Sequence, residues 1–252
     1  MSAAPSLSLV MPMAGRGSRF RQHGRVTPKP LIELEGHPFF WWATESLAAA
    51  AAIDELVFVV LAEHVEAFGI DREILERYPQ AKIVALPEVT AGAAETAVAG
   101  VAALETRGPF AVNDCDHAFA AGDLGPVFDR LRNGAAGALV GFRSTSPAYS
   151  YVELDPERRV TGTVEKQVVS PFAIAGCYLF ADPVEFTGRF DRYRRECPYP
   201  ELFLSGLYNE IIRDGGEVRF HELAQHVSFG TPEELARVQP DVLGALAARW
   251  RD

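Results

Sequence analysis

Short apolar runs alternate with helical segments through the first 145 residues of the chain. The apolar runs lie at 7–13, 55–63, 81–88 and 109–119. Alanine-rich or amphipathic segments, which we expect to be helices, lie between them at 39–52, 65–78 and 92–104. Strands that are apolar throughout and joined by helices are typical of a parallel sheet covered on both faces. The sequence therefore predicts an α/β fold with three layers, a mostly parallel central sheet and helices on both faces.

The second half of the chain has a different pattern. A further helix and strand are expected at 124–133 and 135–143, and an antiparallel hairpin at 150–166 with Asp155, Pro156 and Glu157 at its turn. Beyond the hairpin we expect a strand at 172–180, a helix within 200–213, a strand at 217–224 and helices after 231. We interpret residues 1–252 as one domain, with an α/β half (1–145) and an α+β half (146–252).

Charge and cysteine content limit the partners and the compartment. The chain of 252 residues has a formal net charge of −10 and no block of basic residues, which argues against nucleic acid and anionic membranes as partners. Its three cysteines are widely spaced, and the N-terminus does not read as a signal peptide. No apolar stretch reaches the roughly 20 residues of a membrane span. We therefore expect a cytoplasmic location, and a homo-oligomer is left open.

Positive charge gathers where the first apolar run ends, in "MAGRGSRF" and "TPKP". Gly15 and Gly17 would let backbone N–H groups approach an anion, and Arg16 and Arg19 would add forked hydrogen bonds to phosphate oxygens. Two prolines hold the backbone of Lys29 extended. Gly-x-Gly after a strand is also common in plain turns. The stretch is neither a dinucleotide fingerprint nor a P-loop, because the third glycine and a Gly-Lys-Ser/Thr are missing.

These two stretches together resemble the N-terminal motif, Gly-x-Gly-x-Arg followed by Pro-Lys-Pro, of nucleotidyltransferases that join a nucleoside triphosphate to a sugar phosphate or a similar phosphate. The resemblance implies a Rossmann-like nucleotidyltransferase fold, in which the first half binds the nucleotide and the second half the acceptor. It also implies catalytic roles for Arg19 and Lys29. The loop around the triphosphate would be formed by Met13, Ala14, Gly15, Arg16 and Gly17.

A small-residue segment, "TAGAAET", lies where this family lines the nucleoside. The resemblance assigns Thr90, Gly92, Ala93 and Thr96 to nucleotide binding. The same segment also fits the start of an alanine-rich helix capped by Thr90.

Two acids follow the fourth apolar run, in "VNDCDHAF". Asp114 and Asp116 would point to the same side of a regular strand, and carboxylate oxygens suit Mg²⁺. The resemblance maps the metal-binding aspartate of the family to Asp116, with Asp114 as second choice. Either acid could instead cap a turn. His117 fits a structural or substrate-lining role better than a metal ligand, because no Cys or His lies at ligand spacing from it.

The acceptor would be bound by the second half. By resemblance, Glu165 and Lys166 after the hairpin meet the acceptor and its phosphate, and Gly176 lies in the small-residue strand that follows. The segment "LFLSGLYNEII" is similar to a capsule-type or lipopolysaccharide-type subgroup, which suggests Tyr208 and Asn209 as further acceptor contacts; helix packing explains them equally well. One departure stands out: the closing Trp-x-Asp of the family is replaced by a histidine and Ser228.

The expected reaction joins an NTP and a phosphorylated acceptor, with Mg²⁺, to give an NDP-linked product and pyrophosphate for surface polysaccharide synthesis. CTP is slightly favoured over UTP and dTTP, and the acceptor is a sugar phosphate or a small non-sugar phosphate. Two alternatives stay open. Ser228 suggests a catalytically inactive nucleotide-binding module, and the Asp-x-Asp at 114–116 also fits a glycosyltransferase of related fold that uses an NDP-sugar.

Overall fold

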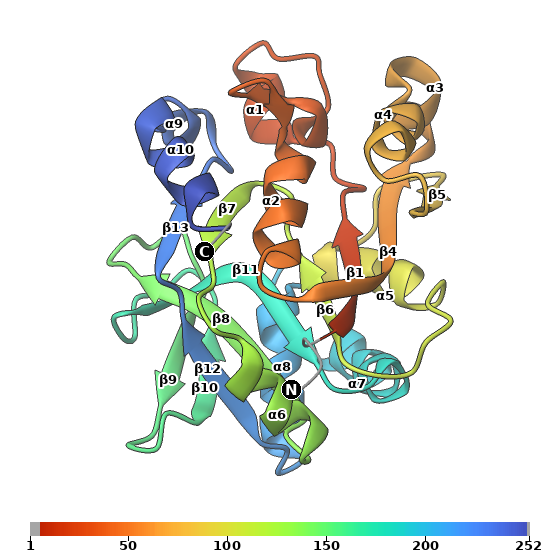
Figure 1. Cartoon of the computed structure of the whole chain (residues 1–252). Coiled ribbons are helices and arrows are strands. Elements are labelled where there is room, and N and C mark those ends of the chain that lie inside the picture. Colours follow the sequence, from red (N-terminus) through yellow and green to blue (C-terminus); the bar gives the residue numbers. More distant parts are fainter. Residues whose placement is uncertain (1–5, 251–252) are drawn as a thin grey trace.

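The computed structural model describes residues 6–250, and in this range one central sheet carries helices on both sides (Figure 1). Its strands follow the order β10-β9-β11-β6-β1-β4-β5, and β8 and β12 extend it from β11. The strands are β1 (Ser6–Pro12), β4 (Ala52–Leu61), β5 (Lys82–Leu86), β6 (Phe110–Asn113), β8 (Gly137–Arg143), β9 (Tyr151–Leu154), β10 (Val160–Val164), β11 (Phe172–Phe180) and β12 (Val218–Glu222). The predicted α/β fold is confirmed.

Two small sheets accompany the central one: β2 (Glu33–Leu34) with β3 (His37–Pro38), and β7 (His117–Ala120) with β13 (Gln225–Ser228). The helices are α1 (Ser18–Gln22), α2 (Phe39–Ala48), α3 (Ala62–Phe68), α4 (Ile70–Arg77), α5 (Ala93–Val101), α6 (Gly125–Arg132), α7 (Pro183–Glu196), α8 (Leu204–Arg213), α9 (Pro232–Leu235) and α10 (Pro240–Ala248), with a 3₁₀ turn, η1 (Lys29–Leu31). Among the described residues, no helix combines the length and the apolar character needed to cross a membrane.

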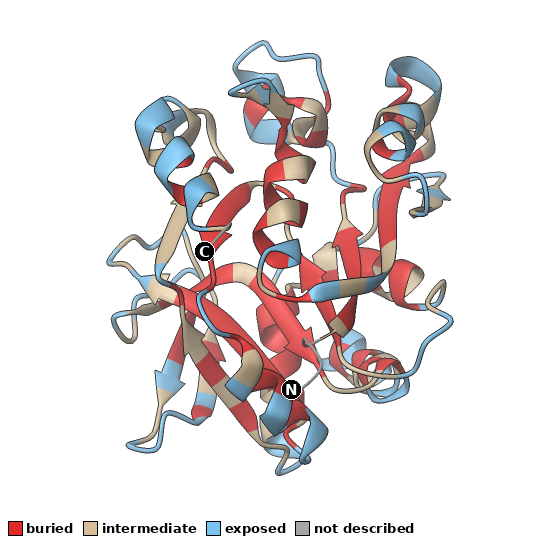
Figure 2. Ribbon diagram, viewed as in Figure 1, coloured by how far each residue is buried: buried red, intermediate tan, exposed pale blue. Residues whose placement is uncertain are grey.

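Strand β1 lies at the centre of the parallel part of the sheet, with β4 on one side and β6 on the other. Its residues Leu9, Val10 and Met11 are fully buried, as Figure 2 shows for the middle of the sheet. On one face the core includes side chains of α5, α7 and α8, and on the other those of α2, α4 and α6. Because both faces are covered, β1 is apolar from Leu9 to Met11, and the buried hydroxyl of Ser8 finds a partner in the hydroxyl of Thr106 at 2.8 Å.

Strand β11 enters the sheet antiparallel and divides it. It pairs with β8 on one side, whereas on the other side it pairs with β9 at Ala173 and with β6 through Cys177–Phe180. The register shifts between Ile174 and Cys177, where Gly176 has φ of +79°. This bulge bends β11 and opens the sheet between β9 and β6, as bulges beside functional sites commonly do.

The fourth apolar run does not form one strand, contrary to the prediction. Strand β6 ends at Asn113, and after Asp114, Cys115 and Asp116 the chain turns into β7, which pairs with β13 rather than with the central sheet. Strand alternation therefore does not place the two acids. They lie in the connection between two sheets, at the carboxyl end of β6.

Helix α7 and strand β13 were not predicted. The start signal for α7 is present, because the carboxylate of Asp182 accepts hydrogen bonds from the N–H groups of Val184 and Glu185. Its buried residues, Phe186, Phe190 and Tyr193, recur at helical spacing among many charged residues.

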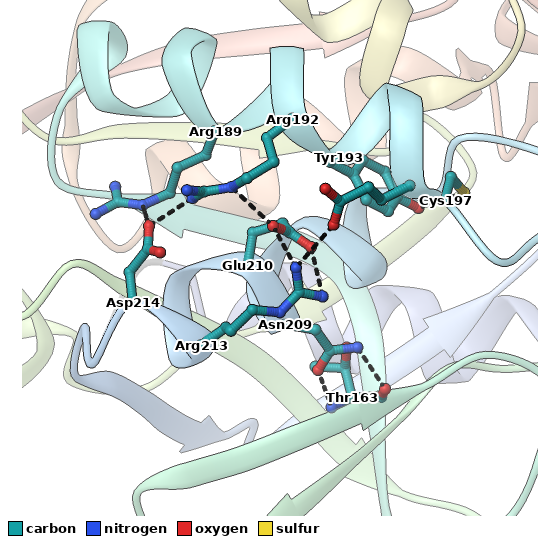
Figure 3. Close-up of polar contacts among 10 residues, drawn as sticks. Thr163, Arg189, Arg192, Tyr193, Cys197, Asn209, Glu210, Arg213 and Asp214 are labelled. Atoms are coloured by element: carbon teal, nitrogen blue, oxygen red, sulfur yellow. Dashed lines mark hydrogen bonds and ion pairs between the residues drawn. The ribbon is translucent and has the colours of Figure 1, made fainter.

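A buried carboxylate joins α7 to α8 (Figure 3). The side chain of Glu210 is only 3% exposed, and it pairs with Arg192 at 3.0 Å and with Arg213 at 3.0 Å. Two guanidinium groups thus compensate one buried charge, as burial of an ionised group requires.

Glu55 holds the connection that follows α5. Its carboxylate accepts hydrogen bonds from the N–H groups of Glu105 and Thr106 and from the ammonium of Lys82. Burial would raise the pKa of Glu55, but the hydrogen bonds from Lys82 and Thr106 lower it to about 2.

We predict that Glu55→Gln lowers the free energy of unfolding by about 1–3 kcal/mol at neutral pH, because hydrogen bonds to a charged acceptor are lost. The folded-state pKa lies below the usual 4.5, so this stabilisation is present above 4.5 and fades as pH falls towards 2. Urea unfolding of wild type and variant at a series of pH values measures it. Glu76→Gln on the exposed side of α4 is the control, and a difference that stays constant with pH would contradict the prediction.

Candidate active site

The loop after β1 runs along the carboxyl edge of the sheet and leads into the short helix α1. Gly17 has φ of +60°, and a Cβ there would lie 3.1 Å from the Cβ of Lys29. Glycine therefore serves two purposes at this position: it adopts the left-handed conformation and lets the loop pack against Lys29. Arg16 and Arg19 are exposed, and Arg16 lies 3.6 Å from the carboxylate of Glu63.

An ion pair between Lys29 and Asp116 connects this loop region to the carboxyl end of β6. The ammonium of Lys29 donates a hydrogen bond to Asp116 Oδ2, and the two side chains are 19% and 21% exposed. Burial alone would raise the pKa of Asp116 and lower that of Lys29. The attraction between the two charges outweighs burial in both cases, so the pKa of Asp116 lies below and that of Lys29 above its usual value.

Asp114 lies against the bulge of β11. Its N–H donates to the carbonyl of Gly176 at 2.8 Å, and a Cβ on Gly176 would lie 2.8 Å from Asp114 Oδ2. Only glycine leaves room for the carboxylate at this distance. The pKa of Asp114 is raised to about 7, mainly by burial and secondly by repulsion from the charge of Asp116.

Two adjoining cavities open at this edge and share Asp114 and Asp116 as wall residues. The first, which we call the loop cavity, has a volume of about 410 Å³. Its wall includes most of the residues assigned to the triphosphate and to catalysis: Met13, Gly15, Arg16, Gly17, Arg19 and Lys29. Ala14 does not line this cavity; it is 2% exposed and belongs to the apolar core below the loop.

Only part of the segment assigned to nucleoside binding lies at the cavities. Ala93 lines both of them. Thr90 and Thr96 instead share a hydrogen bond of 2.6 Å at the start of α5, and a Cβ on Gly92 would collide with the backbone of Leu202. These three residues thus shape the start of α5, which is the alternative given for this segment, and their contact with a nucleotide stays a prediction.

The second cavity, which we call the hairpin cavity, has a volume of about 500 Å³ and lies beside the end of β10. Glu165, Lys166 and Gly176 line it, as expected of acceptor residues. Lys166 has φ of +53°, which is unusual for a residue with a side chain and is common at functional sites. Its ammonium lies 4.7 Å from the ring centre of Phe203, and no carboxylate within residues 6–250 forms an ion pair with it.

Tyr208 and Asn209 do not reach this cavity, which corrects their assignment to the acceptor. The hydroxyl of Tyr208 is buried and donates to the carbonyl groups of Leu179 and Ala138. The amide of Asn209 exchanges two hydrogen bonds with the backbone of Thr163 on β10 (Figure 3). Both residues fasten α8 to the sheet, which is the helix-packing alternative.

The histidine and serine that replace the closing family motif lie on β13, opposite β7. His226 hydrogen-bonds with His117 at 3.3 Å, and His117 contacts Asn113 Oδ1 at 3.0 Å. Burial lowers the pKa of His117 to about 4 and that of His226 well below its usual value, so both rings are neutral near pH 7. Ser228 also lines the hairpin cavity and brings no charge to it.

Sequence reasoning missed several residues of the hairpin cavity, among them Tyr149, Ser150, Glu201, Phe203 and Glu234. Glu234 lies in the short helix α9, and Tyr149 and Ser150 lie just before β9. Glu201 and Phe203 precede α8 in an irregular segment. Their roles depend on where β11 and α8 bring them together, and no local pattern carries that information.

The carboxylates at the border of the two cavities suit a magnesium ion whose remaining ligands would be substrate oxygens. Asp114 and Asp116 offer carboxylate oxygens at the border of the two cavities. Within the described residues, no three His, Cys, Asp or Glu side chains gather into a complete metal site. Mg²⁺ commonly takes one or two carboxylates together with phosphate oxygens and water, which fits this arrangement.

Comparisons with known proteins agree with this geometry. The profile of the MobA-like NTP transferase domain matches residues 10–155. The 2-C-methyl-D-erythritol 4-phosphate cytidylyltransferase of Nocardia farcinica is 29% identical over 166 residues, which cover 64% of this chain and 65% of that protein. The chain thus matches slightly less than two thirds of the length of this relative.

Solved structures extend the similarity over nearly the whole chain. The nucleoside-diphosphate-sugar pyrophosphorylase of Vibrio cholerae RC9 has a TM-score of 0.79 and 25% identity, covering 94% of this chain and 99% of that one. The inositol-1-phosphate CTP transferase of T. maritima has a TM-score of 0.77 and covers 100% of this chain and 98% of that one. At 14% identity, it shows a shared fold.

We predict that Tyr208→Phe lowers the free energy of unfolding by about 1 kcal/mol, because a buried hydroxyl loses its two carbonyl partners. Urea unfolding measures the loss. Tyr199→Phe removes a hydroxyl that donates no hydrogen bond within residues 6–250 and is the matched control. Unchanged stability of Tyr208→Phe would contradict the packing role.

Proposed function

Because the chain belongs to the MobA-like NTP transferase family, we propose that it transfers a nucleotidyl group from an NTP to a phosphorylated acceptor. The observation that carries the proposal is the ion pair between Lys29 and Asp116 at the border of two cavities. The loop cavity offers glycines and arginines that suit a triphosphate, and the hairpin cavity offers Lys166 for the phosphate of the acceptor. Two anionic substrates would meet at this border.

In the proposed reaction an oxygen of the acceptor phosphate attacks the α-phosphorus of the NTP in line. A new P–O bond forms, the bond between the α-phosphorus and the oxygen bridging to the β-phosphorus breaks, and pyrophosphate leaves with the electron pair. No covalent intermediate with the protein is needed. Catalysis then consists of positioning and of neutralising charge.

The cationic residues divide these tasks. Arg19 lies on the walls of both cavities and would neutralise the departing pyrophosphate. Lys29 would neutralise the α-phosphate, and Lys166 would hold the acceptor phosphate. Asp116, assisted by Asp114, would hold Mg²⁺. When bound, the ion would screen the negative charges of the phosphates.

CTP is our choice of nucleotide, supported by the cytidylyltransferase named for the Nocardia farcinica relative. We also place the product among the nucleotide-activated precursors of surface polysaccharides, an assignment supported by the sequence likeness of "LFLSGLYNEII" to the capsule-type or lipopolysaccharide-type subgroup.

Ser228 favours a second candidate, a nucleotide-binding module without turnover, because serine is a poor substitute for a carboxylate metal ligand. One experiment separates the two. The purified chain is incubated with Mg²⁺, each of the common NTPs and a panel of sugar and non-sugar phosphates, and pyrophosphate is measured. Pyrophosphate formed only when both an NTP and an acceptor are present supports the transferase. Nucleotide binding without pyrophosphate for every pair supports the module.

We predict that Lys29→Met lowers the rate of pyrophosphate release by about 10²-fold or more, because a positioned cation is worth about 3 kcal/mol to a transition state in which two anions meet. Methionine keeps the length of the side chain and removes its charge. Steady-state pyrophosphate release is the measurement, with circular dichroism to verify folding.

Arg130→Gln serves as the control, because Arg130 is exposed on α6 away from both cavities and its loss removes one positive charge. A folded Lys29→Met protein with nearly the wild-type rate would exclude the role of Lys29.

A further inference from the structure

The hairpin cavity carries more negative charge than a phosphate site requires. Five carboxylates line it and only two permanent cations, Arg19 and Lys166. Asp116 is neutralised by Lys29. The remaining excess comes from the glutamates of the wall, chiefly Glu165 and Glu234.

Glu165 is held by hydroxyl groups. Its Oε2 accepts hydrogen bonds from Ser150 Oγ and from Ser205 Oγ, the second at 2.8 Å. Within residues 6–250 no lysine or arginine forms an ion pair with it, and no hydrogen bond reaches its Oε1. The carboxylate is therefore fixed in place while its charge stays uncompensated and one oxygen stays available.

Glu234 is held in the same way. Its Oε1 accepts a hydrogen bond of 2.6 Å from the hydroxyl of Tyr149, and no cation within the described part of the chain pairs with it. A Cβ added to Gly230 would lie 3.4 Å from Glu234 Oε2 and 2.2 Å from Asp116 Oδ2. The second oxygen of Glu234 thus faces the region of Asp116, beside the expected position of the reacting phosphate.

One short segment places both glutamates. Tyr149 and Ser150 are consecutive, and they hold Glu234 from α9 and Glu165 from the end of β10. The carbonyl of Tyr149 also accepts a hydrogen bond from the N–H of Lys166 at 3.1 Å. The segment therefore sets two carboxylates and one ammonium group around a single cavity.

Two well-buried glutamates elsewhere in this chain are paired with cations, whereas the partly buried Glu45 is held by the hydroxyl of Tyr78. Glu55 pairs with Lys82, and Glu210 pairs with two arginines. An uncompensated charge is costly in a partly buried site. Glu165 and Glu234 differ from Glu45 in that both line the cavity proposed to bind a substrate, so a ligand in this cavity can supply the missing positive charge.

Resting on the proposed nucleotidyl transfer, we propose that the acceptor is a phosphorylated amine. Its phosphate lies at Lys166, on the side of Asp116, and its ammonium group lies between Glu165 and Glu234. The ammonium donates to the oxygens that the serine and tyrosine hydroxyls leave unoccupied. A neutral polyol would satisfy the same hydrogen bonds but would leave two negative charges beside two substrates that are themselves anionic.

Matched pairs of acceptors test this inference. O-phosphoethanolamine is compared with 2-hydroxyethyl phosphate, and glucosamine 1-phosphate with glucose 1-phosphate, so that each pair exchanges an amine for a hydroxyl. Acceptor binding is measured by calorimetry, with Mg²⁺ and a CTP analogue that carries a methylene group between the α- and β-phosphorus. Pyrophosphate release with CTP is measured in parallel. In at least one pair, the amine member should bind and react about tenfold or more better than its hydroxyl counterpart.

Variants assign the preference to the two glutamates. Glu165→Gln and Glu234→Gln keep the shape and remove the charge, and each should reduce the preference for the amine several-fold while affecting the hydroxyl member less. Glu66→Gln, on the exposed side of α3, changes net charge equally and should leave the preference unchanged. Circular dichroism verifies folding.

The outcomes separate this inference from the proposed function. Turnover in which no amine member exceeds its hydroxyl counterpart overturns the phosphorylated amine and leaves the transferase intact. An amine preference in binding without pyrophosphate from any pair supports the amine site and counts against the transferase. If the preference for the amine member persists in both Glu165→Gln and Glu234→Gln, the assignment of the amine to these two glutamates is wrong. If no amine member binds more tightly than its hydroxyl counterpart, the inference of a phosphorylated amine is wrong.

Discussion

The ion pair between Lys29 and Asp116 connects the two parts of the proposed site. The residues are 87 positions apart, one after the loop of β1 and the other beyond the end of β6. Without the ammonium group, the main compensation for the burial of Asp116 would be lost, and the pKa of Asp114, raised to about 7 even beside Lys29, would rise further. The pair therefore explains how an acidic chain keeps two carboxylates at the place where anionic substrates are expected to meet.

The bulge of β11 makes room for this arrangement. At Gly176 the sheet divides between β6 and β9, and Asp114 occupies the space against the missing side chain. The hairpin formed by β9 and β10 follows β11 in the order of the sheet, and Glu165 and Lys166 come directly after it. Backbone geometry in one antiparallel strand thus shapes the hairpin cavity, whereas the loop cavity lies at the carboxyl edge of the parallel strands.

The fold and the clustering of the glycine loop with Lys29 could be predicted because their signals are local. Apolar runs specify buried strands, and the glycines and Lys29 lie within about twenty residues of β1. The acceptor side depends on contacts between distant segments, so Ser150 and Glu234 were missed. Tyr208 was suggested by similarity to a family subgroup, with helix packing as the alternative, and its buried hydroxyl favours helix packing. The assignment of Asp116 to a metal rests on the family motif and stays a prediction, and the strand expected to carry this residue ends at Asn113.

The central claim is that an acceptor phosphate held at Lys166 attacks an α-phosphate held at Lys29. Following a heavy oxygen isotope placed in the acceptor phosphate tests it most directly. Mass spectrometry of the products should show all of the label in the NDP-linked product, including the oxygen that bridges the two phosphorus atoms, and none in pyrophosphate. Label recovered in pyrophosphate or in free phosphate would contradict the account, because a different P–O bond would then have formed or broken.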